Sequence, residues 1–391
     1  MQHPVRVFIA GGLALLLAGS LTQPAHAQAP PIKIGVVFPL TGPISAQGIP
    51  ERDAIKQAFD EENYQVAGRK IELVIEDSQG KPDVALTKFR KVVEGDRVHL
   101  LLSELVSSVG AAVAPYVNSE KIPWVSTVAL AGLTRNLRSP YTFRFVPSSY
   151  QFGLVAAQWL KKQGWKKVYF IGWNAPPSRE AFDAVRNVFG EENVVDAVFP
   201  PVGTPDYGPY LAKMDPSKAD GLLAAMWGAD SPRITRQWAE YGLKGRLPFF
   251  GIASFTSEEL LGSMPPEAEG IMSAYVYCGT LDTPENRRFV DGYKSRYKAV
   301  PGSYPYMGYM SAKFVIQALK EIQGKAEDRD AFVTALRKTQ LRGPMGMASF
   351  DERQGMVGDF YVLKVARKDG QLQNDCIERI PQVKDPYELF P

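Results

Sequence analysis

Apolar, strand-like runs alternate with amphipathic, helix-like segments along most of this chain, and the alternation occurs twice. In the first half, the predicted strands are 32–39, 71–76, 98–102 and 122–125, and the helices between them are 50–62, 82–94 and 109–117. The rhythm restarts after residue 149, with strands at 167–172, 194–199, 221–226 and 248–252. Such alternation is typical of parallel sheets covered by helices on both faces. We therefore predict an α/β protein with two Rossmann-like lobes, each built on a mostly parallel sheet.

The C-terminal part of the chain departs from this rhythm. After predicted helices at 284–298, 310–323 and 328–338 come short strands at 349–351, 360–366 and 376–380. The turn Lys368-Asp369-Gly370 between the last two strands is a hairpin signal. Strands that follow a run of helices indicate that the C-terminus returns to a sheet already built, which would make both lobes discontinuous.

The first 27 residues have the features of a cleaved export signal. Arg6 provides a positive start, 7–21 is an apolar run, and Ala25-His26-Ala27 is a small-residue cleavage site. The run is shorter than the ~20 residues that a membrane-spanning helix needs, and no Leu-x-Gly-Cys lipobox lies near the site. We therefore expect a periplasmic protein that begins at Gln28, and its length suits two domains.

Net charge and cysteine content narrow the class of protein further. The formal net charge is +3, which is too small to indicate a nucleic acid or an anionic membrane surface as a partner. Cys278 and Cys376 are the two cysteines of the sequence. An even count in an oxidising compartment suggests one disulfide, and two buried free thiols are the alternative.

The stretch 98–134 contains a candidate anion site. Its two apolar strands each lead into a Ser- or Thr-containing turn and a helix start, and Ser107 and Ser108 occupy the expected N-cap of helix 109–117. Unpaired N–H groups and the positive end of a helix dipole favour an anion at such a place. The candidates are a phosphate, a reacting substrate and a bound carboxylate.

Catalytic motifs are missing from the sequence, which favours the bound carboxylate. Once the signal is removed, His99 is the one remaining histidine, and it opens an apolar strand. Most hydrolase mechanisms depend on histidine, and the sequence has no HExxH, Gly-x-Ser-x-Gly or Cys/His cluster. Neither Gly-x-Gly-x-x-Gly nor a Walker A loop follows the predicted strands. We therefore expect no enzymatic activity, no metal site and no cofactor.

Large aromatic side chains gather near the predicted strand ends, where open α/β sheets bind ligands. Trp173 and Trp227 each directly follow a predicted strand, and the pattern is equally compatible with a place in the core and in a cleft. For the other candidates, core packing is the alternative at each position: Tyr150, Phe152, Phe255, Tyr304, Tyr306 and Tyr309. Glu104, in the loop after 98–102, could face either solvent or the cleft.

Four stretches, 34–42, 76–82, 143–148 and 309–319, carry a family resemblance through their order and spacing. They begin Ile-Gly-Val-Val-Phe-Pro, Glu-Asp-Ser-Gln-Gly, Phe-Arg-Phe-Val-Pro and Tyr-Met-Ser-Ala. Together they resemble the branched-chain amino-acid-binding family, the type I periplasmic solute-binding proteins of ABC importers, over about 32–370. The resemblance implies a monomeric receptor for an inner-membrane ABC permease, with two lobes that close over a small ligand.

The same resemblance implies lobe boundaries. One lobe would comprise 28–148 plus 278–352, and the other 149–277 plus 353–391. Three hinge strands would join them, near 146–149, 275–279 and 351–358.

Ligand-binding residues also follow from the resemblance. In the family, a serine at the start of a first-lobe helix and backbone amides after the next strand hold a carboxylate. Ser107 matches that serine best and Ser108 second, while Val128 and Leu130 fall at the amide positions. The first-lobe wall of the pocket is implied to include Gln47, Leu105 and Val106.

The second lobe departs from the amino-acid-binding pattern. Ala253 falls where those members carry the acidic partner of the ligand ammonium, and Trp227 replaces an assisting tyrosine. A buried ammonium without a carboxylate partner is strongly disfavoured. We therefore expect an aromatic acid of the benzoate or cinnamate type, with its ring against Trp227, Trp173 and Tyr150.

Three alternatives remain open at the level of the sequence. An amino acid, amide or urea-like ligand could use Asp230 or Glu104 as its cation partner. An exported enzyme and a sensor that feeds a membrane kinase are alternatives of a different class.

Overall fold

The first lobe is built on a six-stranded sheet. In a computed structural model, which describes residues 1, 2, 4 and 29–389, the strand order of this sheet is β2-β3-β1-β4-β5-β6. Its strands are β1 (Ile32–Phe38), β2 (Gln65–Val66), β3 (Arg69–Asp77), β4 (Leu100–Leu102), β5 (Trp124–Ser126) and β6 (Thr142–Arg144). All neighbours run parallel except β2 and β3. The predicted cleavage signal, 1–27, lies almost entirely outside the described residues.

Helices cover both faces of this sheet. They are α1 (Ser45–Asp60), α2 (Pro82–Arg90) and α3 (Ser107–Glu120), joined later in the chain by α9 (Pro284–Tyr297), α10 (Ser303–Glu321) and α11 (Arg329–Lys338). Successive residues of a strand face opposite sides, so Val36 belongs to the same core cluster as Ile55 of α1, while Val37 belongs to a second cluster with Phe89 of α2. Both side chains are fully buried, which explains the continuous apolar run of β1.

The second lobe is built on a larger, mixed sheet. Its order is β12-β13-β14-β11-β10-β9-β7-β8, and β15 pairs with β14. The parallel strands are β7 (Val168–Gly172), β8 (Val194–Val198), β9 (Gly221–Ala225), β10 (Phe249–Ile252) and β11 (Met272–Tyr275). The antiparallel strands are β12 (Leu341–Gly343), β13 (Gly346–Phe350), β14 (Met356–Lys368) and β15 (Gln371–Val383). The helices of this lobe are α4 (Ser149–Lys162), α5 (Pro176–Phe189), α6 (Gly208–Leu211), α7 (Asp230–Glu240) and α8 (Glu258–Leu261).

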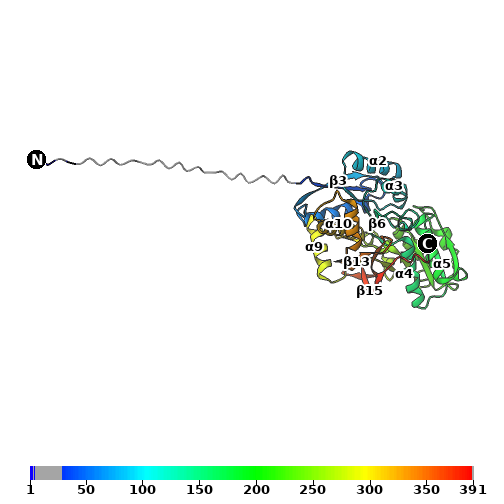
Figure 1. Cartoon of the computed structure of the whole chain (residues 1–391). Helices are drawn as coiled ribbons and strands as arrows, with labels where there is room; N and C mark the ends of the chain where they lie inside the picture. The colour runs from blue at the N-terminus through cyan, green and yellow to red at the C-terminus, as the bar shows by residue number, and fades with distance from the viewer. Residues whose placement is uncertain (3, 5–28, 390–391) are drawn as a thin grey trace.

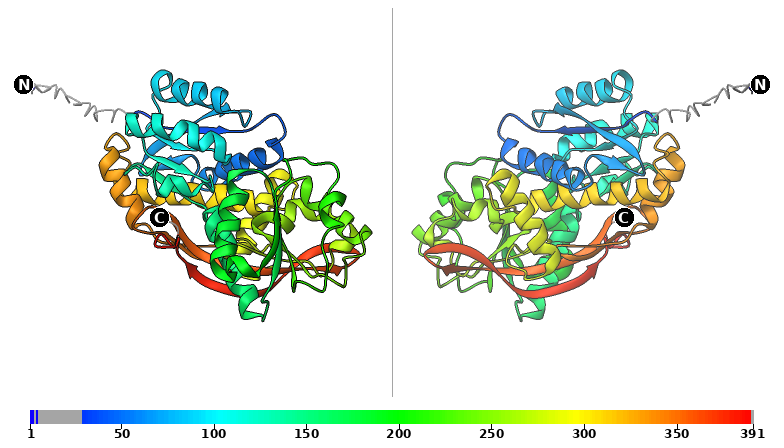
Figure 2. Two further views of the ribbon diagram at one scale, coloured as in Figure 1. Left: turned by 90° about the vertical axis from the view of Figure 1, so that its right-hand side faces the viewer. Right: turned by 90° about the vertical axis from the view of Figure 1, so that its left-hand side faces the viewer.

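The two lobes lie side by side, with α2 and α3 in one and α4 and α5 in the other (Figure 1). The predicted C-terminal hairpin is confirmed, and it is longer than predicted: β14 and β15 run along one edge of the molecule (Figure 2). Its turn residues Asp369 and Gly370 both have positive φ, 50° and 79°, as the favoured two-residue hairpin turn requires.

The chain passes between the two lobes after β6 and after β11, and it returns a third time through the stretch that follows α11, which includes the turn between β13 and β14. The first and third passages are neighbours, because the Arg144 N–H donates to the Gln354 carbonyl at 3.0 Å. Strands β12 and β13 pair with β14, so 341–350 extend the second sheet, although the predicted boundaries put them in the first lobe. The boundaries otherwise stay a prediction.

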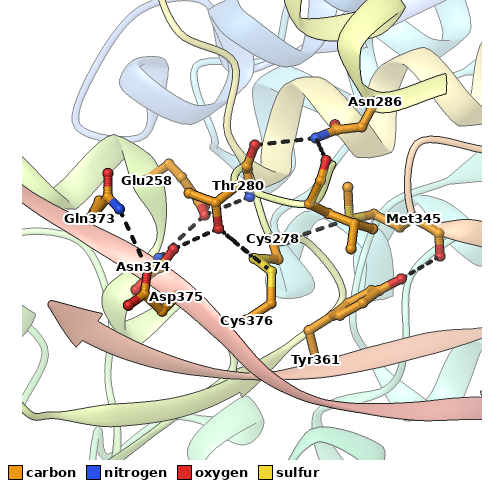
Figure 3. The surroundings of a disulfide bond; sticks show 12 residues. Glu258, Cys278, Thr280, Asn286, Met345, Tyr361, Gln373, Asn374, Asp375 and Cys376 are labelled. Atoms are coloured by element: carbon orange, nitrogen blue, oxygen red, sulfur yellow. Dashed lines mark hydrogen bonds between the residues drawn. A yellow bond between two sulfur atoms is a disulfide. The ribbon is translucent and has the colours of Figure 1, made fainter. Parts of the chain in front are cut away.

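A disulfide supports the second passage. Cys278 follows β11 and is bonded to Cys376 of β15, with their Cα atoms 6.1 Å apart. Around it, the Thr280 hydroxyl donates to the Asn374 carbonyl at 2.8 Å (Figure 3). The bond therefore fixes the passage after β11 to the C-terminal hairpin. No helix among the described residues has the length and apolar character needed to cross a membrane.

Candidate functional site

A cavity of about 470 Å³ is lined by residues of both lobes. Its lining comes from the start of α1, the loops after β4, β5, β7, β9 and β10, and the beginnings of α3, α4 and α10. Most of these segments follow the carboxyl ends of parallel strands, the usual place for a ligand in an open α/β sheet. The volume falls within the ~300–1,000 Å³ typical of small-molecule sites.

The N-terminus of α3 opens into this cavity. The structure corrects one detail of the prediction: α3 begins at Ser107, so Ser107 and Ser108 lie in its first turn instead of forming the N-cap. The N-cap is Val106, which provides no side-chain cap. The first N–H groups of a helix have no partner within it. Both serines line the cavity, and the helix therefore presents uncapped donors and its positive end to a ligand.

Glu104 shapes the loop that leads into α3. It is fully buried and has φ of 70°, and its Oε1 accepts hydrogen bonds from the N–H groups of Leu105 and Val106, at 3.0 and 2.9 Å. Burial raises its pKa to about 7. Leu105 and Val106 line the cavity and Glu104 does not, so this carboxyl holds the loop in place behind the pocket wall.

Val128 and Leu130, whose backbone amides are predicted to hold the ligand carboxylate, are not among the residues that line the cavity. Val128 is fully buried, and its N–H donates to Ser126 Oγ at 3.1 Å. Thr127 and Ala129 line the cavity in their place. The residues that reach the cavity after β5 are therefore Thr127 and Ala129, and the role of the Val128 and Leu130 amides stays a prediction.

Two tryptophans form an aromatic wall on the second lobe. Trp173 and Trp227 both line the cavity, and their rings meet edge to face with centroids 5.1 Å apart. The Trp173 Nε1–H donates to Asp230 Oδ2 at 2.7 Å, and the Trp227 Nε1–H donates to the Ile252 carbonyl at 2.9 Å. Both polar edges are therefore satisfied within the protein, and the rings offer apolar surface to the cavity.

The remaining predicted residues divide between cavity and core. Gln47 and Ala253 line the cavity, and Ala253 has a left-handed φ of 55°. Tyr150 does not line it: its side chain is fully buried against α5, where its hydroxyl accepts a hydrogen bond from Asn187 Nδ2 at 2.8 Å. Of the other aromatic candidates, Phe152 and Tyr304 line the cavity, whereas Phe255, Tyr306 and Tyr309 do not.

Glu51 of α1 is a cavity residue that the sequence analysis missed. It is fully buried, its Oε1 lies 2.5 Å from Thr127 Oγ1, and its Oε2 has no hydrogen-bond partner. Burial raises its pKa well above the ordinary value. Its position four residues after Gln47 was the available signal, because residues four apart share a helix face. Other cavity residues that we did not predict include Ile44, Ala175, Pro176, Pro177, Val202, Ser254, Tyr275 and Met307.

Neither acid considered as a cation partner, Asp230 or Glu104, lines the cavity. Asp230 accepts hydrogen bonds from Trp173 and from the Gly203 N–H at 2.8 Å, and forms an ion pair with Arg233. Its carboxylate therefore holds the Trp173 ring in place. Among the described residues that line the cavity, Glu51 is the one ionisable carboxyl and none is basic.

Comparisons with known proteins agree with this architecture. A model of the family described as periplasmic binding protein matches residues 31–371. Leu/Ile/Val-binding protein homolog 6 of Brucella melitensis is 26% identical over 385 residues, which cover 96% of this chain and 97% of that protein. An ABC transporter substrate-binding protein from Sphaerobacter thermophilus aligns with a TM-score of 0.86 and 32% identity, over 90% of this chain and 98% of its own.

A second solved structure is a solute-binding protein of an ABC transporter from Rhodopseudomonas palustris BisB5, in complex with 3,4-dihydroxy benzoic acid. It aligns with a TM-score of 0.85 and 28% identity, over 91% of this chain and 99% of its own. The matched family model spans most of the chain, and both structures share the two-lobed fold. This chain therefore belongs to the periplasmic binding protein family, as a non-enzymatic solute-binding protein of the ABC-transporter type.

Proposed function

We propose that this protein captures a small aromatic carboxylate in the cavity and delivers it to an inner-membrane ABC permease. The observation that carries the proposal is the uncapped N-terminus of α3 facing an aromatic wall. Ser107 and Ser108 line one part of the cavity, and Trp173 and Trp227 line another. Helix N–H groups suit a carboxylate, and aromatic rings suit an aromatic body.

The cavity lining suits an anion that is held by backbone dipoles and not by a cationic side chain. No basic side chain lines it within the described part of the chain, so the helix N-terminus is the source of positive potential. The Rhodopseudomonas palustris relative, 28% identical, is in complex with 3,4-dihydroxy benzoic acid, which is a ligand of this class. Export through the predicted signal at 1–27 and a monomeric receptor form part of the same proposal.

Closure of the lobes would follow from the three passages between the sheets. Phe152, at the start of α4, lies directly after the first passage, and its ring lies 5.3 Å from that of Tyr275, the last residue before the second. Both rings line the cavity. A ligand that contacts them would contact the segments about which hinge motion occurs.

Titration calorimetry tests the proposal with a panel of benzoate, hydroxybenzoates, cinnamate, leucine and glutamate. We expect binding of at least one aromatic acid and none of the two amino acids. Tight binding of leucine or glutamate, with none of the aromatic acids, would refute the proposal.

A paired substitution on α3 tests the carboxylate-holding role. Ser107→Ala should weaken binding by about 1–2 kcal/mol, the usual loss for one hydrogen bond to a charged group. Ser119→Ala is the matched control, because the Ser119 hydroxyl is exposed and donates to the Tyr116 carbonyl at the other end of the helix. Equal affinity of both variants would show that the Ser107 hydroxyl does not bind the ligand.

A further inference from the structure

The contacts of Thr127 favour a protonated Glu51. The Thr127 hydroxyl lies 2.9 Å from the Glu104 carbonyl and 2.5 Å from Glu51 Oε1. A carbonyl oxygen can only accept, so both contacts are hydrogen bonds at the same time only when the single hydroxyl hydrogen of Thr127 is donated to Glu104. The shorter contact is then a hydrogen bond only when Glu51 carries a proton and donates it to Thr127. Both contacts are satisfied together by a neutral Glu51.

The surroundings of Glu51 favour the same neutral state. Its side chain is fully buried, and the negative charges of Glu104 and Glu259 add to burial in raising its pKa. Within the described lining of the cavity no cation compensates for an ionised Glu51. A buried carboxylate without such compensation is costly.

Neutral Glu51 leaves one hydrogen-bonding group unused. With its proton donated to Thr127, the carbonyl-like Oε2 remains, buried and without a partner in a residue that lines the cavity. Such an atom accepts a hydrogen bond and cannot donate one. It matches a hydroxyl on the ligand, whereas an unsubstituted ring would leave it unsatisfied at a cost.

We propose that Glu51 is a specificity residue that accepts a hydrogen bond from a hydroxyl group of the ligand, so that hydroxylated aromatic acids bind in preference to unsubstituted ones. This inference rests on the proposed function and adds to it a substrate subclass and the residue that selects it. Thr127 acts as a positioning residue, because its hydroxyl accepts the hydrogen bond that Glu51 donates and thereby leaves Glu51 Oε2 for the ligand.

The test compares benzoate with 2-, 3- and 4-hydroxybenzoate by titration calorimetry on the full-length mature protein. We expect the best hydroxybenzoate to bind about ten-fold more tightly than benzoate, the difference that one buried hydrogen bond makes. Glu51→Met, which keeps the chain length and removes both oxygens, should reduce this ratio to about one. Glu51→Gln, which keeps an acceptor oxygen and cannot ionise, should retain the ratio.

Glu258→Gln is the matched control. It alters another carboxyl, whose Oε1 accepts a hydrogen bond from the Gly279 N–H at 3.1 Å and which does not line the cavity, and it should leave the ratio unchanged. Thermal unfolding of each variant shows whether it is folded. If Glu51→Met does not fold, the ratio in Glu51→Gln decides, since loss of the preference in that variant overturns the inference.

Several outcomes separate the two proposals. An unchanged ratio in Glu51→Met, or an equal loss for benzoate and hydroxybenzoate, overturns the role of Glu51 while the aromatic-acid receptor stands. Binding of leucine alone overturns both. Calorimetry in buffers of different ionisation enthalpy adds a further check: release of about one proton on hydroxybenzoate binding, absent in Glu51→Gln, would show that Glu51 ionises and overturns the inference.

Discussion

Replacing Asp385 should destabilise the protein more than any surface charge, because this carboxylate compensates two buried cations. Asp385 Oδ2 lies 2.5 Å from Arg144 Nη2, and Oδ1 lies 2.8 Å from Arg135 Nη2. The side chains of Asp385 and Arg144 are fully buried, and that of Arg135 is 5% exposed. The C-terminal residues after β15 thus return to the first lobe and pair with a strand residue of its sheet.

The magnitude follows from what remains after the change. In Asp385→Ala, Arg144 keeps acceptors at the Val146 carbonyl and at Thr134 Oγ1 but loses the carboxylate of its buried ion pair, although the carboxyl groups of Glu180 and Asp351 still interact with it electrostatically. Removing one partner of a buried pair costs about 3–5 kcal/mol. For a chain of this size that corresponds to a fall of about 4–7 °C in the melting temperature.

The assay is thermal and urea unfolding followed by circular dichroism, with a surface pair as control. Asp282 pairs with Arg287, and their side chains are 82% and 57% exposed, so Asp282→Ala should cost less than about 1 kcal/mol. Adding Arg144→Met to Asp385→Ala should restore part of the loss, because one unpaired cation is then removed. Equal melting temperatures of Asp385→Ala and Asp282→Ala would refute the reasoning.

Three further predictions concern the cavity, pH and the disulfide. Ala253→Asp should weaken aromatic-acid binding at least about ten-fold, because it adds a negative charge to the wall of a cavity that holds an anion. Calorimetry measures the affinity, and an unchanged value would show that Ala253 does not lie near the bound ligand. Burial raises the pKa values of Glu104 and Glu258 to about 7. The folded state therefore binds more protons than the unfolded state between about pH 5 and 7, and stability must fall as pH rises through that window. The melting temperature should be higher at pH 5 than at pH 8, and a smaller difference is expected in Glu104→Gln. Cys376→Ser should lower the free energy of unfolding by about 2–4 kcal/mol, because Cys278 and Cys376 are 98 residues apart and their bond restricts the unfolded chain; a urea midpoint equal to that of the oxidised parent would contradict this.

The lobes could be predicted from the sequence because their signal is long and repeated. Strand β7 is apolar throughout, and β1 is apolar apart from Lys33, because both faces of each strand are buried. The hairpin turn was predictable for a local reason, because Asp369 and Gly370 tolerate the positive φ that the turn needs. Pairing of β12 and β13 with the second sheet depends on contacts across the molecule, and no local pattern encodes it.

The errors in the site have local causes. Pro50 suggested the first turn of a helix, but α1 begins at Ser45 and contains Pro50 within it. With the start placed at Pro50, Glu51 would be a solvated first-turn acid, whereas the actual start puts it one turn after Gln47 on the cavity side. After β5, which ends at Ser126, Thr127 lines the cavity while Val128 belongs to the core cluster that includes Val109 and Val113 of α3.

The ligand class then depends on the charge of one carboxyl. Asp230 is engaged by Trp173 and Arg233, and Glu104 by the backbone of its own loop. Glu51 is therefore the acid in the described cavity lining that a ligand ammonium could meet. Ionised, Glu51 would favour an amino acid and would repel an aromatic carboxylate that lacks a cation of its own. When neutral, Glu51 does not repel the ligand carboxylate, and it can accept a hydrogen bond from a ligand hydroxyl. The hydrogen-bonding capacity of Thr127 favours the neutral state, and the aromatic wall is the surface that such a ligand would cover.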